Sequence, residues 1–261
     1  MKKFGFGTMR LPLTDSQDKS SIDIEELKKM VDEFMAAGFT YFDTAFTYHE
    51  QLSESVLKEA LVDRYDRDSY IFADKMPTVL VKSGDEYPMY FNKQLEKTGV
   101  GYFDYYLMHN MGRDRYFNTH KWGGFDFARR MKEEGKIKKF GFSFHDDAEM
   151  LDQILTEHPE VDFVQLQINY LDWDNKIIQS RACYETARKY NKPIVVMEPV
   201  KGGTLANLPK EADSMLYEYA PGVLPVSYAL RFAASLPGVF MVLSGMSSLE
   251  QVKDNIHIMD N

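Results

Sequence analysis

The sequence predicts a single-domain α/β protein, a (β/α)8 TIM barrel, and three observations support this prediction. Short runs rich in Phe, Tyr, Val and Ile alternate with longer segments that have helical spacing and charged faces. Eight such runs occur, which is the number of strands in this barrel. No Pro/Gly/Ser-rich linker or short-period repeat interrupts the alternation, so residues 1–261 are expected to form one domain.

The predicted strands follow one another at intervals long enough to hold a helix. They are residues 3–7, 40–43, 69–74, 103–108, 138–143, 162–167, 193–198 and 239–244. An open doubly wound sheet is the structural alternative for such an alternation. That fold carries a GxGxxG phosphate fingerprint after its first strand, whereas "GFGTMR" has only the first two glycines. The sequence therefore favours the barrel.

Local signals place individual helices between the strands. The segment 23–38 carries an apolar stripe with i, i+3, i+4, i+7 spacing, and Gly38 stands where a helix C-cap glycine belongs. The apolar positions of this stripe are Ile24, Leu27, Met30, Val31 and Phe34. Near the other end of the chain, "SLEQVKDN" opens with an N-cap signature, which predicts that the last helix starts at about Ser248.

Composition limits the compartment and the partners. The formal net charge is −9 with scattered acidic residues, which argues against a nucleic-acid or acidic-membrane partner because those attract clustered Lys and Arg. Cys183, the only cysteine, lies in a predicted helix, so neither a disulfide framework nor a cysteine metal site is expected. The chain has no run of signal-peptide or membrane-span length. We expect a cytoplasmic protein without a membrane partner, and the sequence does not indicate its oligomeric state.

Polar and ionisable residues follow the predicted strands. In such barrels the active site lies at the C-terminal ends of the strands, where the βα loops converge. In strand order, the residues expected there are Thr8 and Met9, Asp43 and Tyr48, Lys75, His109 and Asn110, Ser143 and His145, Gln167 and Asn169, Glu198 and Lys201, and Ser244 and Ser247. The sequence therefore predicts that one end of the barrel carries the chemistry.

Four of these residues suggest proton transfer to a carbonyl oxygen. A phenol has a pKa near ~10, so Tyr48 needs a neighbouring cation to stabilise its phenolate, and Lys75 offers one. A carboxylate at Asp43 would keep that ammonium charged and in place. A neutral His109 would offer a hydrogen bond to the substrate oxygen.

Proton delivery alone does not reduce a carbonyl, so a hydride has to come from a bound nicotinamide cofactor. The late loops suit its phosphates. "VKGGTL" at residues 200–205 is rich in glycine, and "GMSS" leads into a helix N-terminus, whose free N–H groups and dipole favour an anion.

The sequence resembles the aldo-keto reductases along essentially its whole length. The motifs that carry the resemblance are "GFGTMR", "FDTAFTYHE", "FADKMP", "DYYLMHN", "KKFGFSFH", "VQLQINY", "MEPVKGG" and "LSGMSSLEQVKDN", in the order and spacing of that family. The resemblance implies that Asp43, Tyr48, Lys75 and His109 are a catalytic tetrad with Tyr48 as general acid. It also implies an NAD(P)H-dependent oxidoreductase that reduces a small aldehyde or ketone to an alcohol.

The resemblance further implies a set of cofactor contacts. These are Thr8, Met9, Asp43, Ser143, Gln165, Met197, Ser247, Gln251 and Asn255. Ser143 and Gln165 are expected at the nicotinamide carboxamide, Met197 against the ring, and the last three around the adenosine.

The sequence departs from the family pattern at three of the positions around the cofactor. Phe144 replaces a common asparagine, and Met197 replaces a common tyrosine or tryptophan, whose packing on the ring its polarizable sulfur is expected to provide. Gln251 replaces an arginine often used near the 2′-phosphate, with Lys253 nearby as a candidate substitute. NADPH is the first expectation for the cofactor, and NADH is the alternative.

The sequence looks closest to a bacterial branch in which an iron–sulfur segment follows the barrel. One cysteine cannot hold such a cluster, so none is expected in this chain. The sequence ends at "HIMDN", which predicts either a truncated form or a natural short form with an open substrate pocket.

Two rival functions remain open at this point. One is a metal-dependent hydrolase with Asp43, His109, His145 and Glu198 as ligands, although Lys75 would repel a cation there and no metal is expected. The other is a sensor or accessory subunit that binds the cofactor with negligible turnover.

Overall fold

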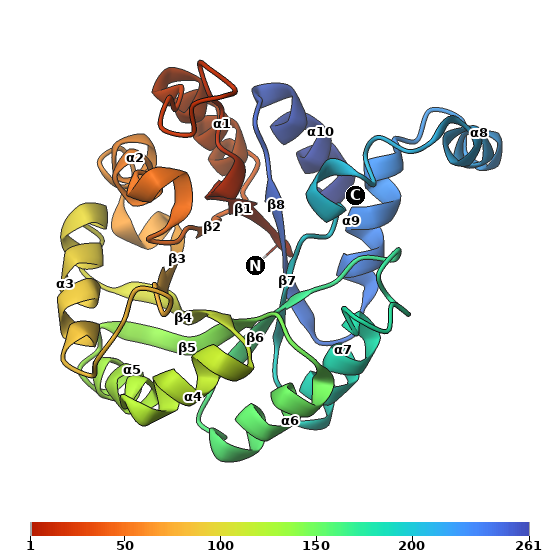
Figure 1. The fold of residues 1–261 in the computed structure, drawn as a ribbon. Coiled ribbons are helices and arrows are strands. Elements are labelled where there is room, and N and C mark those ends of the chain that lie inside the picture. Colours follow the sequence, from red (N-terminus) through yellow and green to blue (C-terminus); the bar gives the residue numbers. More distant parts are fainter. Residues whose placement is uncertain (1, 261) are drawn as a thin grey trace.

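The computed structural model describes residues 2–260, and these form a closed barrel of eight parallel strands surrounded by helices (Figure 1). Each strand pairs with the next one in the chain, and β8 closes the barrel against β1. The strands are β1 Phe4–Gly7, β2 Tyr41–Asp43, β3 Ile71–Met76, β4 Phe103–Met111, β5 Ile137–Phe144, β6 Phe163–Gln167, β7 Ile194–Met197 and β8 Val239–Gly245. The predicted fold class and all eight predicted strands are confirmed.

The strand ends differ from the predictions in an informative way. β3 continues to Met76 and β4 to Met111, so Lys75 and His109 lie inside strands rather than after them. The sequence pattern predicts ends at Asp74 and Met108. Ladder pairing continues beyond Asp74, since Lys75 is paired with Leu107, and β4 continues beyond Met108 through a register shift to Met111, which is paired with Phe144. Backbone pairing does not depend on side-chain polarity, and these side chains point into the barrel mouth.

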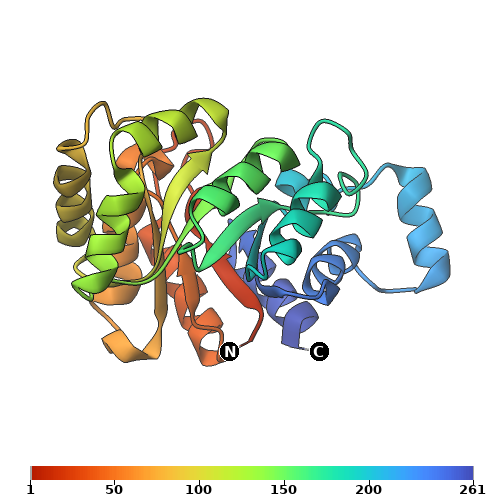
Figure 2. The ribbon, with the colours of Figure 1, turned by 90° about the horizontal axis from the view of Figure 1, so that it is seen from below.

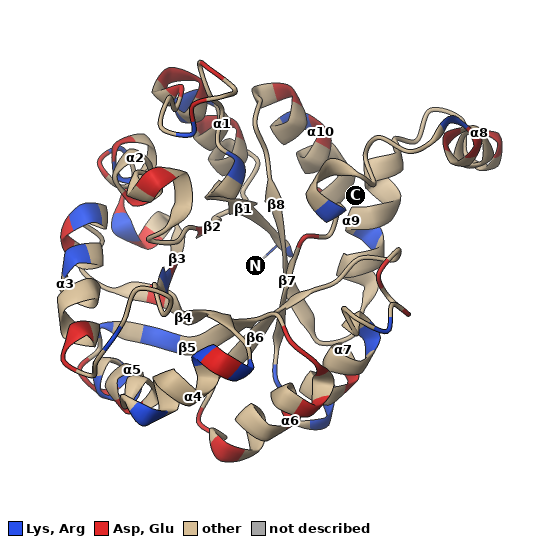
Figure 3. Ribbon diagram, in the orientation of Figure 1, with Lys and Arg blue, Asp and Glu red and all other residues tan. Residues whose placement is uncertain are grey.

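Ten α-helices of the described chain surround the strands (Figure 1). They are α1 Ile24–Ala36, α2 Ser53–Leu57, α3 Glu86–Thr98, α4 Arg113–Lys121, α5 Gly124–Glu133, α6 Ala148–Glu157, α7 Ser180–Lys189, α8 Lys210–Tyr219, α9 Pro225–Ser235 and α10 Leu249–Asp260. In Figure 2, α8 projects away from the barrel, and none of its residues is buried. Figure 3 shows acidic and basic residues interspersed over the outer helices.

The first and last helices form as their end signals predicted. The Asp23 carboxylate caps α1 by accepting from the Glu26 N–H at 3.0 Å, and Gly38 has a φ of +78°, which favours glycine just after a helix. Of the predicted stripe, Leu27, Met30, Val31 and Phe34 are buried. At α10 the Ser248 hydroxyl accepts from the Gln251 N–H at 3.3 Å, which confirms the predicted start.

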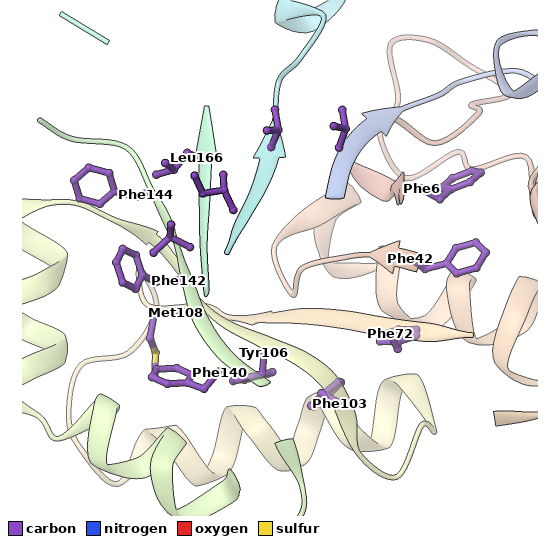
Figure 4. Packing of buried hydrophobic residues seen from close by; sticks show 14 of the residues in the cluster. Phe6, Phe42, Phe72, Phe103, Tyr106, Met108, Phe140, Phe142, Phe144 and Leu166 are labelled. Atoms are coloured by element: carbon purple, nitrogen blue, oxygen red, sulfur yellow. The ribbon is translucent and has the colours of Figure 1, made fainter. Parts of the chain in front are cut away.

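The core has two parts, one on each side of the strands. Outward-facing strand residues such as Phe6, Phe42 and Phe72 pack against the helices (Figure 4). Inward-facing residues fill the barrel, and they are Tyr41, Ala73, Leu107, Phe163, Val195, Met241 and Leu243. Gly5 and Gly141 make room for them, since a Cβ on Gly141 would lie 2.7 Å from the Phe163 ring.

No helix within residues 2–260 is both long enough and apolar enough to cross a lipid bilayer.

Candidate active site

The barrel interior places one layer of side chains directly above the apolar filling. Because side chains alternate along a strand, the residue two positions after each inward-facing residue also points inward, one layer nearer the C-terminal ends. This layer consists of Gly7, Asp43, Lys75, His109, Ser143, Gln165, Met197 and Gly245. Six different strands thus bring three tetrad members, Asp43, Lys75 and His109, to the same level as three predicted cofactor contacts. These contacts are Ser143, Gln165 and Met197.

Asp43 and Lys75 form a buried ion pair in this layer. The Lys75 Nζ lies 2.5 Å from the Asp43 Oδ1 and donates to the Thr44 carbonyl at 2.8 Å. Only 1% of Lys75 and 4% of Asp43 is exposed. Burial opposes the charged ammonium, yet Asp43 and the neighbouring Tyr48 hold the pKa of Lys75 above its usual value. Burial outweighs the ion pair at Asp43 and raises the pKa of that carboxyl.

Tyr48 reaches the same layer from a turn rather than from a strand. The turn Tyr48–Gln51 contains His49, Glu50 and Gln51 in left-handed backbone conformations, which are strained for residues other than glycine. The His49 ring holds this turn: its Nε2 accepts from the Leu11 N–H at 3.2 Å, and its Nδ1 lies 3.0 Å from the Lys19 carbonyl oxygen. His49 therefore helps to fix the position of Tyr48.

The Tyr48 ring lies close to both the cation and the histidine. Its centroid is 5.1 Å from the Lys75 Nζ and 5.7 Å from the His109 ring centroid, with the two rings at 80°. Burial raises the pKa of the Tyr48 phenol, and Lys75 acts in the opposite direction. The net pKa is raised, so the hydroxyl keeps its proton at neutral pH and can act as an acid.

His109 is held in its neutral form. Burial and the adjacent Lys75 lower the pKa of His109 well below its usual value. The register of β4 against β5 shifts between Met108 and Met111, next to this residue. Hydrogen bonds fix the irregular segment: Thr78 donates to the His109 carbonyl at 2.5 Å, and the Asn110 N–H donates to the Ser143 hydroxyl oxygen at 2.7 Å.

The layer also presents unsatisfied polar atoms to a ligand. The Asp43 Oδ2 and the Gln165 Oε1 are buried and have no hydrogen-bond partner within residues 2–260. The Ser143 hydroxyl oxygen accepts one bond and still has its own hydrogen to donate. A flat carboxamide, which carries both N–H donors and a carbonyl acceptor, matches Gln165 and Ser143. Phe144 faces outward, is buried and packs in the outer core.

Two predicted contacts lie on the short turn after β1. The Thr8 hydroxyl is buried, donates to the Asp43 carbonyl at 3.0 Å and lies 2.8 Å from the Ser53 hydroxyl oxygen. These bonds anchor the end of β2, so Thr8 positions Asp43 rather than presenting its hydroxyl to a ligand. Met9 is 61% exposed beside it.

The predicted adenosine contacts lie around the start of α10, and most of them are already bonded. The Ser247 N–H donates to the Gln251 Oε1 at 2.8 Å, and the Ser247 hydroxyl donates to the Arg10 carbonyl at 2.9 Å. Asn255 is buried and donates to the Ser244 hydroxyl oxygen at 3.2 Å. Gln251 therefore caps its own helix, and a ligand would have to compete with that bond.

Sequence reasoning missed one residue at the α10 start. The Glu26 carboxylate accepts from the Leu249 N–H at 3.1 Å, at the helix end that the sequence assigned to a phosphate. No local signal could reveal this, because Glu26 belongs to α1 and is 223 residues away in the chain.

A set of polar interactions that the sequence did not reveal organises the glycine-rich loop after β7. The Lys201 Nζ forms an ion pair with Asp172, which is almost fully buried. Asp172 in turn accepts from the Asn169 amide at 2.9 Å. Lys201, Gly202 and Gly203 all have positive φ, and a Cβ on Gly202 would lie 3.2 Å from the Arg10 Nη2. The two cations, Lys201 and Arg10, flank this loop.

The residues of the rival metal site are not brought together. Within residues 2–260, Asp43, His109, His145 and Glu198 form no group whose ligand atoms are close enough to share an ion. Asp43 is bound instead to the Lys75 ammonium. A cavity of about 290 Å³ lies outside this layer, and Phe144, His145, Gln167 and Cys183 are among the residues that line it. It adjoins the β5 and β6 loops rather than Tyr48.

The chain is similar to a known protein family and to solved structures. A family model described as the aldo/keto reductase family matches residues 3–261. No curated protein sequence matches. Among solved structures, the chain is similar to an aldo-keto reductase from Bacillus halodurans in its holo form, with a TM-score of 0.75 and 20% identity over 99% of this chain and 87% of that chain.

Two further solved structures are similar to the same extent. One is an aldo-keto reductase from Klebsiella pneumoniae in complex with NADPH, with a TM-score of 0.76 and 18% identity over 99% of this chain and 86% of that chain. The other is from Brucella melitensis, with a TM-score of 0.74 and 19% identity over 99% and 89%. At these identities, the structural likeness establishes the fold.

Proposed function

Because the chain belongs to the aldo/keto reductase family, we propose that its barrel mouth reduces a small aldehyde or ketone to an alcohol with Tyr48 as the general acid. The observation that carries this proposal is the buried Lys75–Asp43 ion pair, which lies beside both the Tyr48 phenol and the neutral His109. A metal-assisted hydrolase would need a different arrangement, in which the carboxylate is free to bind a cation.

The four side chains divide the proton chemistry between them. Tyr48 donates its proton to the carbonyl oxygen as the carbonyl carbon accepts a hydride, so the C=O bond becomes a C–O–H group. Lys75 stabilises the phenolate that remains, and Asp43 keeps Lys75 charged and in place. His109 is neutral, so its ring N–H can hydrogen-bond to the same oxygen and orient it. Water returns a proton to Tyr48 afterwards.

A reduced nicotinamide dinucleotide, when bound, supplies the hydride. The unpartnered Gln165 Oε1 and the free hydrogen of the Ser143 hydroxyl suit its carboxamide, and Met197 stands in the same layer to pack on the ring. For the phosphates, the chain offers Lys201, Arg10 and the loop Gly202–Gly203.

NADPH remains the first expectation, supported by the NADPH that the Klebsiella pneumoniae structure holds. Two features of this chain weaken a preference for the phosphorylated form. Gln251 is engaged in capping α10, and the Glu26 carboxylate lies at the same helix end. NADH is therefore the alternative that has to be tested beside it. We also propose that the protein acts in the cytoplasm.

Titration of the purified chain with NADPH and NADH, followed by tryptophan fluorescence and calorimetry, tests the cofactor site. Micromolar binding of either supports the proposal and selects the cofactor. A carbonyl screen that monitors loss of the reduced cofactor then tests the chemistry. Tight binding with no turnover on any carbonyl would instead favour a sensor or accessory subunit. A folded sample that binds neither cofactor would overturn the proposal.

A further inference from the structure

Three potential metal ligands from distant parts of the chain meet on the outer surface of the barrel. His120 lies in the last turn of α4, Glu157 is the last residue of α6, and His158 follows it. The candidate ligand atoms of these three residues all lie within 4.8 Å of one another. None of them belongs to the layer of side chains that forms the barrel mouth. Figure 1 shows α4 and α6 as neighbours outside the strands.

The spacing of the two ring nitrogens fits a tetrahedral metal ion. The His120 Nδ1 lies 3.3 Å from the His158 Nε2. Zinc–nitrogen bonds are about 2.0–2.1 Å long, so two nitrogens at tetrahedral positions on one ion lie about 3.3 Å apart. A hydrogen bond between the rings is the simpler explanation, but this separation is longer than the ~2.7–3.2 Å usual for bonds donated by nitrogen.

The surroundings of His158 orient its Nε2 toward the cluster. Its ring stacks on Phe125 with a centroid distance of 3.6 Å and an interplanar angle of 9°. On its other side, Nδ1 lies 3.2 Å from the Glu160 carboxylate. A carboxylate behind a histidine is the usual arrangement around metal sites, because it fixes the tautomer and makes the ligating nitrogen more basic.

Glu157 is likewise held by neighbouring side chains. The Tyr116 hydroxyl donates to its Oε2, and the Gln153 amide donates to its Oε1 at 2.8 Å. The cluster thus combines two imidazoles with one carboxylate, a set that suits Zn²⁺ better than Mg²⁺ or Ca²⁺, which prefer oxygen ligands.

We propose that His120, Glu157 and His158 bind one Zn²⁺ ion, with a water molecule in the fourth position. The ion joins the C-terminal end of α4 to that of α6 and stabilises this part of the helical layer. Sequence reasoning did not find the site, because His120 lies 38 residues before His158 and "THKW" and "TEHPE" contain no ligand pair with metal-binding spacing.

The test uses full-length protein that has been treated with a chelator and then dialysed into metal-free buffer. Calorimetric titration with zinc chloride should show one ion bound per chain at micromolar or lower concentration. Co²⁺ should give the visible absorption of a tetrahedral site. At zinc concentrations about 100-fold above the dissociation constant, the melting temperature should rise by roughly 5 °C.

Variants separate this site from adventitious binding. His120→Ala, at an exposed position, and the isosteric Glu157→Gln should each weaken zinc binding at least ten-fold, and Tyr116→Phe should weaken it about ten-fold. His257→Ala, which removes an exposed histidine on α10, serves as the matched control and should leave binding unchanged. No zinc binding, or binding that the His120 and Glu157 variants leave unaltered, would overturn the proposal.

Discussion

The Lys75 Nζ lies 2.5 Å from the Asp43 Oδ1, and both side chains are almost fully buried. A buried ion pair stabilises the fold little as a whole, because removing two charges from water is costly. Removing one member of the pair is strongly destabilising, because the remaining buried charge then has no partner. The pair is therefore best explained by its position beside Tyr48, where it keeps a cation next to a phenol.

Asp43→Asn should accordingly destabilise the protein by about 3–5 kcal/mol, because it leaves the Lys75 ammonium buried and unpaired. Urea unfolding measures this change. Asp63→Asn is the matched control: it breaks the exposed Lys58–Asp63 pair and should cost less than ~1 kcal/mol. Equal costs for the two variants would contradict the role given to the buried pair.

Tyr48→Phe removes only a hydroxyl. We expect kcat for carbonyl reduction to fall by about 10²–10⁴-fold, because the general acid is lost while the ring still packs against His109. Steady-state kinetics measures the loss. Cofactor affinity, measured by fluorescence titration, should stay within about two-fold of the wild type. A variant that turns over as fast as the wild type would show that another group protonates the oxygen.

The fold and the inner part of the site could be predicted from sequence for a definite physical reason. Apolar runs mark strands, and period-two alternation sends every second side chain inward, which brings Asp43, Lys75 and His109 to one level. Order along the chain then suffices to place residues from neighbouring strands side by side.

Contacts that depend on tertiary structure could not be read in this way. The left-handed turn at His49 is not signalled by glycine, and its ring is held by groups near residues 11 and 19. Gln251 stands where family members often carry an arginine, yet in the fold it caps its own helix. Glu26 and His120 act on residues far away in the chain.

The depressed pKa of His109 predicts a pH dependence of stability. Below pH ~6.5 the unfolded chain binds a proton at this residue, whereas the folded chain does not until its lower pKa is reached. The unfolded state then holds more protons, so the free energy of unfolding falls as the pH falls, by up to ~1.4 kcal/mol per unit. The stability that depends on a neutral His109 is therefore fully present above pH ~6.5 and is lost as the pH falls below that value.

Urea unfolding of wild type and His109→Gln between pH 7 and pH 5 measures this contribution. The pKa values of His145 and His158 are also lowered, so both proteins should lose stability on acidification. The difference between them isolates His109, and the wild type should lose more. Parallel curves would mean that His109 titrates alike in the folded and unfolded states.

The start of α10 should influence the choice between NADPH and NADH. The Glu26 carboxylate lies 3.1 Å from the Leu249 amide nitrogen, so a negative charge already occupies the positive end of the helix dipole. It would repel an adenosine 2′-phosphate there. Glu26→Gln keeps an oxygen that can accept the same bond but removes the charge. Affinity for NADPH should rise about two- to five-fold, corresponding to ~0.3–1 kcal/mol, while affinity for NADH stays the same.

Calorimetric titration of wild type and Glu26→Gln with both cofactors measures this difference. Repeating it at high salt provides an internal control, because screening should reduce the gain at this half-buried carboxylate. Glu25→Gln, on the neighbouring residue of the same helix, removes an equal charge whose partner is Lys28 and should change neither affinity. An equal gain for NADH and NADPH would show that Glu26 acts on the helix itself and not on the 2′-phosphate.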